Sequence, residues 1–278
     1  MEEQERVRRD WRIPDELWER IVPLLPPGKP HPLGCHNPRV SDRAAMDAIF
    51  FRLRTGCQWN ALSATGICSS SSAHRRFQEW SEAGVFLKLW QIGLAEYDAL
   101  EGIDWEWLSM DGAMTKAPLG GGKKVGPNPT DRGKTGTKRS VLSEGGGVPI
   151  GLVVAGANRN DFKLLRETIE SIVVERPQPT EEQAQGMGLD KGYDYDEVRD
   201  ILQEFAFTAH IRARGEEAQA LKREAGFRAR RWVVERTHSW MNRFRAILVR
   251  WEKKAANYLA LLHLACAYIT FKQAGLLG

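Results

Sequence analysis

The chain has 278 residues, of which 42% are hydrophobic and 27% are charged, and its formal net charge is +4. This composition excludes wholesale disorder and predicts a packed core, in one large domain or two ordinary ones. No apolar run reaches the roughly 18 residues that a membrane helix needs, and the charged start does not follow the pattern of a secretory leader. The four cysteines are scattered, which is typical of reduced thiols in a cytoplasmic protein.

Positive charge is concentrated in two segments. Residues 114–140 contain seven Lys or Arg residues and one Asp, and residues 211–255 contain thirteen Lys or Arg residues and five Glu. Two basic segments in a nearly neutral chain favour a polyanionic partner. Solvated surface charge explains either segment equally well when that segment is considered by itself.

The first hundred residues predict a small all-helical domain. Capping residues and apolar positions at helical spacing indicate helices over residues 16–24, from Ser41 to Gly56, after the Ser run 69–72, and over residues 85–100. A late basic helix in such a domain is what a helix-turn-helix DNA-binding protein needs. On that helix, Arg75 and Arg76 are predicted to contact DNA.

From residue 101 to residue 278 the pattern predicts a second domain of the α/β class. The expected elements are a strand at 103–111, a loop at 114–136, a hairpin of 137–144 with 147–155, a helix from 158 or 160 to 174, a strand ending at Asp190, a helix at 195–205, a strand at 206–212, a polar stretch at 213–229, a helix carrying Glu235, and a buried terminal helix at 257–270. This order fits a mixed sheet with helices on both faces.

Three carboxylates of this second domain suggest a shared site. Asp111 closes the apolar run Trp105–Met110, Asp190 follows the run Gly186–Leu189, and Glu235 lies on a basic helix. Each has a simpler explanation when taken alone: an Asp-Gly turn, a helix cap, and an ion pair with Arg231 one helical turn away.

Considered together, two Asp at strand ends and a Glu on a helix can hold Mg²⁺ or Mn²⁺. A pair of such ions ~3.5–4 Å apart drives phosphodiester chemistry. The basic surroundings indicate that the phosphodiester belongs to DNA. The histidines have no zinc-binding spacing, and Gly133-Lys134-Thr135 is no phosphate-binding NTPase loop, because that motif needs a Gly where this chain has Asn128.

Five groups of residues carry a family resemblance. They are Asp15–Pro27 with Phe51–Trp59, then Asp111-Gly112, then Asn128–Lys134 with Gly136–Arg139, then Asp190-Lys-Gly-Tyr-Asp194, and finally Arg231-Trp-Val-Val-Glu235 with Asn242–Arg245. In these motifs the chain closely resembles bacterial insertion-sequence transposases of the DDE type, in the family-five group. The resemblance extends from about Trp11 to Phe271.

This resemblance implies an RNase H-like catalytic fold, two divalent metal ions, and DNA cleavage followed by strand transfer at terminal inverted repeats. It makes Asp111, Asp190 and Glu235 the catalytic, metal-binding triad. The residues expected to contact DNA near the active site are Arg132, Lys134, Lys138, Arg139, Arg231, Arg236 and Arg243. The expected partners are the element's terminal repeats and target DNA, in the bacterial cytoplasm or nucleoid, and pairing two ends suggests at least a homodimer.

The chain departs from the family pattern at two places. Asn242 stands where the family has Lys or Arg seven residues after the Glu, with Arg243 next to it, and the Ser-rich segment 63–72 lacks the usual aromatic and Pro residues. Two alternatives stay open. An RNase H-like nuclease or resolvase would cleave without joining, and a DNA-binding protein derived from an inactive element would bind DNA in a salt-sensitive way without cleaving it.

Overall fold

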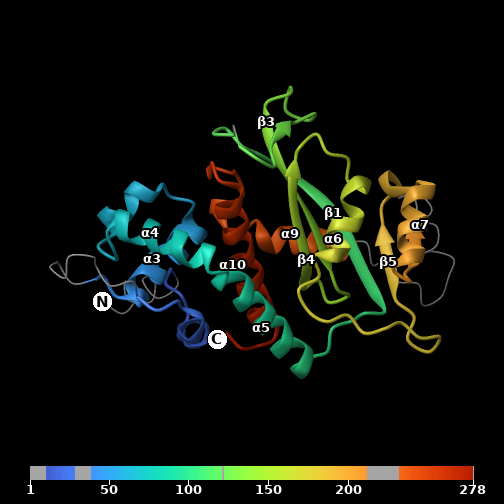
Figure 1. Cartoon of the computed structure of the whole chain (residues 1–278), viewed down its shortest axis with the longest axis horizontal. Coiled ribbons are helices and arrows are strands. Elements are labelled where there is room, and N and C mark those ends of the chain that lie inside the picture. Colours follow the sequence, from blue (N-terminus) through green and yellow to red (C-terminus); the bar gives the residue numbers. More distant parts are fainter. Residues whose placement is uncertain (1–10, 29–38, 121, 212–231, 278) are drawn as a thin grey trace.

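The computed structural model describes residues 11–28, 39–120, 122–211 and 232–277 (Figure 1). Its N-terminal part is helical, as predicted: α2 (Asp15–Ile21), η1 (Val22–Leu24), α3 (Asp42–Thr55), η2 (Trp59–Thr65), α4 (Ser70–Glu82) and α5 (Val85–Leu100). Local sequence sets the ends of α3. Ser41 Oγ accepts a 3.2 Å hydrogen bond from the Ala44 amide, and Gly56 ends the helix with a φ of 71°, which favours glycine.

Among the described residues, six strands form one mixed sheet. They are β1 (Trp107–Lys116), β2 (Gly126–Pro127), β3 (Thr135–Ser143), β4 (Pro149–Gly156), β5 (Gly186–Leu189) and β6 (Thr208–Ile211). β3 pairs antiparallel with β1, β2 and β4, whereas β5 runs parallel to both β1 and β6. The other elements are η3 (Phe162–Leu164), α6 (Leu165–Glu170), η4 (Lys191–Tyr193), α7 (Asp196–Glu204), α9 (Trp232–Met241), η5 (Arg245–Ile247) and α10 (Ala255–Gln273). The predicted α/β class is confirmed.

Three element boundaries differ from the prediction because tertiary pairing overrides local preference. β1 begins at Trp107 and continues past Asp111 to Lys116, because β3 pairs with it along most of this length. The predicted loop at 114–136 therefore begins too early, and it also contains the short strand β2. The predicted helix to residue 174 ends at Glu170, because the Val173 amide hydrogen-bonds to the Ile150 carbonyl at 3.1 Å.

Different helices cover the two faces of the sheet. Lys138 and Arg139 are consecutive on β3, so their side chains point to opposite faces. Lys138 meets Asp161, just before η3, and Arg139 meets Asn242, just after α9. Figure 1 shows α6 and α7 on one side of the sheet, and α9 with α10 on the other.

The helix α5 packs along α10 and joins the N-terminal helices to the sheet (Figure 1). Trp90 of α5 donates from its indole Nε1 to the Pro149 carbonyl of β4 at 3.1 Å. One continuous cluster of buried hydrophobic residues extends from Ile13 to Ala274. The helix α5 ends at Leu100, and the hydrophobic core continues past this residue. The division into two domains near residue 100 stays a prediction.

The described helices include none that is both long and apolar enough to span a membrane. The longest, α10, is the buried terminal helix that the sequence predicted, with Leu261, Leu264 and Phe271 fully buried. Three of the four cysteines lie in described segments, and Cys57, Cys68 and Cys266 are free thiols there.

Candidate active site

Asp111 and Asp190 are brought side by side by the parallel pairing of β1 with β5. In this pairing Ser109 lies opposite Gly188, and each Asp follows two residues later. Asp190 comes directly after β5, as predicted, whereas Asp111 lies inside β1. The predicted strand end at Asp111 was wrong, and so was the Asp-Gly turn that offered its simpler explanation.

A pocket of about 220 Å³ is lined by both of these carboxylates and by a third, Asp161. Asp161 Oδ2 accepts a 2.8 Å hydrogen bond from Lys138 Nζ. Its Oδ1 is buried and has no hydrogen-bond partner in the part of the chain that the structure describes. Sequence reasoning missed Asp161, because an Asp shortly before a helix is usually a cap. The pocket is completed by Asn160, Phe162, Gly192, Tyr193 and Tyr195.

Gly112 makes room for Asp161. A Cβ atom on Gly112 would lie 1.7 Å from Asp161 Oδ1 and 3.3 Å from Lys138 Cδ. Because neighbouring residues of a strand point to opposite faces, Asp111 and Gly112 direct their side-chain positions to different sides of β1. The missing side chain at 112 therefore lets Asp161 approach the backbone beside Asp111 from the α6 face.

We expect Gly112→Ala to displace the Asp161 carboxylate, because the new methyl group and Oδ1 cannot occupy the same space. Overpacking of this kind typically costs about 1–3 kcal/mol. The measurement is the free energy of unfolding in urea of Gly112→Ala, Asp161→Ala and the double variant. Asp161→Ala by itself leaves buried Lys138 without its partner, so the expected result is that Gly112→Ala costs less in the Asp161→Ala background than in the native chain. An equal cost in both backgrounds would show that the clash lies elsewhere.

Burial and neighbouring carboxylates raise the proton affinity of Asp111 and Tyr193. Burial, followed by the negative charges of Asp190, Asp161 and Glu235, raises the pKa of Asp111 from 3.8 to about 6, although the Gly112 amide opposes the shift. Burial and the charges of Asp161, Asp111 and Asp190 also raise the pKa of the Tyr193 phenol. A site with this much unneutralised negative charge favours a cation.

The helix α9 carries Glu235 and His238 close to Asp111. Glu235 has an exposed side chain, and its charge is one of those that raise the pKa of Asp111. His238 is buried, and its Nε2 lies 4.0 Å from Asp111 Oδ2. Burial and the positive charge of Arg139 lower the pKa of His238 to about 4, so the imidazole is neutral near pH 7. The simpler explanation of Glu235 was an ion pair with Arg231, and Arg231 lies outside the described residues.

The residues predicted to contact DNA differ in their exposure. Four have exposed side chains: Arg75, Arg132, Lys134 and Arg243. Three are buried: Arg76, Lys138 and Arg139. Arg236 is partly buried, stacks on the Trp232 and Trp240 rings, and donates to the Gly146 carbonyl. Arg231 lies outside the described residues.

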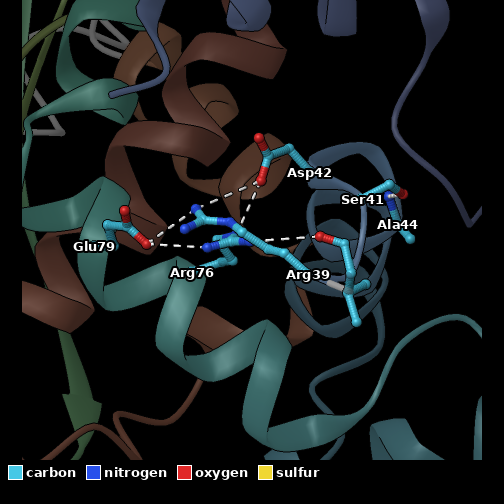
Figure 2. Close-up of polar contacts among 7 residues, drawn as sticks. Arg39, Ser41, Asp42, Ala44, Arg76 and Glu79 are labelled. Atoms are coloured by element: carbon cyan, nitrogen blue, oxygen red, sulfur yellow. Dashed lines mark hydrogen bonds and ion pairs between the residues drawn. The ribbon is translucent and has the colours of Figure 1, made fainter. Parts of the chain in front are cut away.

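Arg76 joins α3 to α4 through a network of ion pairs (Figure 2). Its Nε donates to Asp42 at 2.9 Å, its Nη1 donates to Glu79 at 3.2 Å, and 6% of its surface is exposed. Arg39 reaches the same Glu79 at 3.4 Å. This burial argues against the predicted contact of Arg76 with DNA and gives the residue a structural role. Arg75, its neighbour on α4, stays exposed.

We expect Arg75→Ala and Arg76→Ala to have separable effects. Arg75→Ala should leave stability unchanged and weaken DNA binding, with the slope of log K against log salt shallower by about 0.9 for each phosphate that the side chain no longer neutralises. Arg76→Ala should lower the free energy of unfolding by about 2–3 kcal/mol, because Asp42 and Glu79 lose their buried partner and keep only Arg39, which is farther from both. Urea denaturation and salt-dependent DNA titrations measure the two effects. Equal destabilisation by both variants would contradict this assignment.

Lys138 and Arg139 also have partners inside the protein. Lys138 Nζ donates to Asp161 and to the Arg159 carbonyl, at 2.8 Å and 2.7 Å. Arg139 Nη2 donates to Asn242 Oδ1 at 2.5 Å. Position 242, where the resemblance leads one to expect a basic residue, therefore lies beside a guanidinium supplied by β3. Lys138 and Arg139 thus bind side chains inside the protein, and their burial does not fit the predicted direct contact with DNA.

The fold and site define an α/β protein whose sheet carries a pocket of carboxylates. Residues 106–270 match the family model "Transposase DDE domain", and residues 13–90 match "Putative transposase of IS4/5 family". The chain therefore belongs to the DDE transposase family. The described strands and the site carboxylates, from Asp111 to Glu235, all fall within the first match.

Two relatives come from Burkholderia cepacia. The putative transposase for insertion sequence element IS402 is 34% identical over 162 residues, which is 54% of this chain and 69% of the relative. An uncharacterized 16.2 kDa protein of the same insertion element is 40% identical over 121 residues, or 42% of this chain and 80% of the relative. Among solved structures, the catalytic domain of Mos1 mariner transposase has a TM-score of 0.30 at 12% identity, covering 68% of this chain and 92% of that one.

Membership of this family makes the chain a DNA transposase, and with it an enzyme that uses divalent metal ions. The main prediction from the sequence is thereby confirmed for the family, the fold class and the type of enzyme. The assignment of individual residues to catalysis and to DNA binding remains a prediction.

Proposed function

We propose that Asp111, Asp190 and Glu235 hold two Mg²⁺ or Mn²⁺ ions and that the enzyme cuts and joins DNA at the terminal inverted repeats of an insertion sequence. The observation that carries this proposal is the position of Asp111. Asp111 lies two residues beyond Ser109, and Asp190 lies two residues beyond the Gly188 that pairs with Ser109. The charges of Asp190, Asp161 and Glu235 all raise the pKa of Asp111.

The residues of the pocket fit hard divalent ions. Their donors are carboxylate oxygens, the type that Mg²⁺ prefers, and Asp161 Oδ1 is a buried oxygen without a hydrogen-bond partner in the described structure. The described segments contain no three Asp, Glu, His or Cys side chains placed to hold one ion together. Mg²⁺ does not require such a cage, since one or two carboxylates with water and substrate phosphates suffice.

The chain's own residues prepare this chemistry. Asp111 and Asp190 are fixed by the pairing of two strands, and Asp190 Oδ1 accepts a 2.8 Å hydrogen bond from the Gly192 amide. Lys138 orients Asp161, and neutral His238 adds no positive charge that would compete with a metal. When bound, the ions supply an activated hydroxyl and stabilise the leaving oxygen.

DNA would approach the pocket across the exposed basic residues. Arg132 and Lys134 lie in the turn before β3, and Arg243 follows α9. We assign recognition of the terminal repeats to residues 1–100, with Arg75 as a contact. Pairing of two ends requires at least a homodimer.

The decisive experiment supplies labelled linear DNA carrying both terminal repeats, together with Mg²⁺, and looks for joined product. Joined product supports a transposase that carries out both cleavage and strand transfer. Cleaved but unjoined DNA would favour the nuclease alternative, and binding without cleavage in any metal would favour an inactive DNA-binding derivative.

We expect Mg²⁺ to stabilise the protein more at pH 7.5 than at pH 5. Because folding raises the pKa of Asp111 from 3.8 to about 6, the metal-free protein loses stability as pH rises through this range. At pH 7.5 Asp111 is ionised, so the cost of burying its charge and the repulsion from neighbouring carboxylates are both present, and a bound cation offsets them. The measurement is the Mg²⁺-induced change in Tm at both pH values. Asp111→Asn should abolish the difference, and an unchanged difference in that variant would contradict the assignment.

A further inference from the structure

A second and larger pocket, of about 800 Å³, lies between the N-terminal helices and the segment that leads into α10. Its size falls within the range of small-molecule sites, about 300–1,000 Å³. Trp59, the first residue of η2, and Trp251, shortly before α10, both line it. It shares no lining residue with the smaller pocket that contains Asp111, Asp161 and Asp190, called the acidic pocket below.

The aromatic wall of this pocket is preorganised. The Trp59 ring is held by three neighbours: the His74 ring at 4.7 Å, the Phe77 ring at 5.2 Å and the Arg52 guanidinium at 4.5 Å. Trp251 is 48% exposed, which is unusual for so large an apolar side chain. One held ring, Trp59, and one accessible ring, Trp251, therefore line the same pocket, and flat aromatic surfaces suit the flat face of a nucleobase.

Polar groups between the aromatic rings offer both donors and acceptors. The amides of Gln58, Gln78 and Asn257 line the pocket, together with His74. Burial, followed by the positive charges of Arg52 and Lys254, lowers the pKa of His74, so its ring is neutral near pH 7. Base edges also carry donors and acceptors together.

Exposed lysines stand at the edge of the pocket because a buried arginine ties two segments together. Arg250 is 1% exposed and donates to three lysine carbonyls: to Lys124 at 2.9 Å, to Lys123 at 3.1 Å and to Lys253 at 3.3 Å. The two basic segments of the sequence thus meet at Arg250. Lys253 and Lys254 line the pocket, and both are exposed.

The local charge at this edge is positive. The nearby carboxylate, Glu252, is buried and paired with Arg52 at 2.5 Å. The edge also lies near the end of β1, since the Arg250 amide donates to the Lys116 carbonyl at 2.8 Å. Lys116 is five residues beyond Asp111, about 16 Å along a strand.

We infer that this pocket binds an unstacked nucleobase of the DNA substrate, with the adjoining phosphates on Lys253 and Lys254. The inference rests on the assignment of the chain as a DNA transposase. It adds to the acidic pocket a second place that holds a single strand while the phosphodiester chemistry proceeds. Aromatic rings, amide groups and lysines together match the base and the phosphate of one strand.

The test compares binding of a single-stranded oligonucleotide of about twelve nucleotides with binding of a hairpin duplex of the same composition. Both are titrated, without metal, into the full chain and its variants. Trp251→Ala should weaken single-strand binding by about tenfold or more and leave duplex binding within about twofold. Trp251→Phe should retain most of the affinity. Trp11→Ala, which removes a tryptophan that is 38% exposed elsewhere, should change neither.

Lys253→Gln/Lys254→Gln gives an independent readout. The slope of log K against log salt for the single strand should become shallower by about 1.4, since each neutralised single-strand phosphate contributes about 0.7. The matched control is Lys88→Gln/Lys272→Gln, which removes two exposed lysines outside the pocket. An unchanged slope in the first double variant would overturn the inference.

Three further results would also overturn it: unchanged single-strand binding in Trp251→Ala, an equal loss of duplex binding, or displacement of the oligonucleotide by micromolar free thymidine monophosphate. The last result would identify a site for free nucleotides. Asp111→Asn should bind the single strand like the native chain, so failure of the metal-site proposal and failure of this one give different results.

Discussion

Asp111→Asn is expected to abolish Mg²⁺-dependent joining of DNA while leaving DNA binding intact. Asp111 is influenced by the charges of both Asp190 and Glu235, so it is the carboxylate best placed to be shared by two ions. Loss of a metal ligand removes several kcal/mol of transition-state stabilisation, which corresponds to about a thousandfold or more in rate. The measurement is the rate of product formation with both terminal repeats supplied.

The matched control is Asp200→Asn. This residue is an exposed Asp on α7 that does not line the acidic pocket. It should join DNA at the native rate. Full activity in Asp111→Asn would remove this residue from catalysis, and the same test applies to Asp190→Asn and Glu235→Gln.

Glu252→Ala is expected to cause the largest loss of stability, about 3–5 kcal/mol, because it leaves the Arg52 guanidinium charged and buried without its partner. The pair joins α3 to the segment before α10 at 2.5 Å, with both side chains 3% exposed. Arg52 Nε and Nη1 and Glu252 Oε2 have no other hydrogen-bond partners within the described ranges. Burial raises the pKa of Glu252 even though Arg52 lowers it, so the pair itself carries a desolvation cost.

The double variant Arg52→Met/Glu252→Leu is therefore expected to recover most of this stability, since apolar replacements of a buried pair are often neutral. Urea denaturation measures both variants. Glu96→Ala serves as the control, because its pair with Arg20 is partly exposed and should contribute about 1 kcal/mol or less. A decrease of less than about 1 kcal/mol in Glu252→Ala would contradict the expected role of the pair.

Local sequence predicted several parts of the fold well. Ser41 and Gly56 mark the two ends of α3, and residues 144–147 mark the turn between β3 and β4. Caps and tight turns depend on backbone conformations over a few residues, and such preferences are readable without knowledge of the rest of the chain. The motifs around Asp111, Asp190 and Glu235 predicted membership of the transposase family, because their residue types and spacing are specific to it.

The length of β1 could not be predicted in this way. Asp111-Gly112 has the sequence of a turn, yet the pairing of β3 with Gly112–Lys116 keeps it extended. Pairing between strands distant in sequence outweighs the local turn preference. The sequence also could not predict which basic side chains are buried. Arg75 and Arg76 are adjacent and identical in type, and Arg76 is the buried one because it pairs with the Asp42 and Glu79 carboxylates.

By itself, then, the sequence determined the class of enzyme and the two ends of α3, and it predicted three acidic site residues, because these depend on short motifs. Tertiary structure decided that Asp161 shares a pocket with Asp111 and Asp190, that Lys138 and Arg139 are buried, and that Arg250 joins two basic segments beside an aromatic pocket. These features arise from contacts between residues far apart along the chain, and no local pattern records which distant segments will meet.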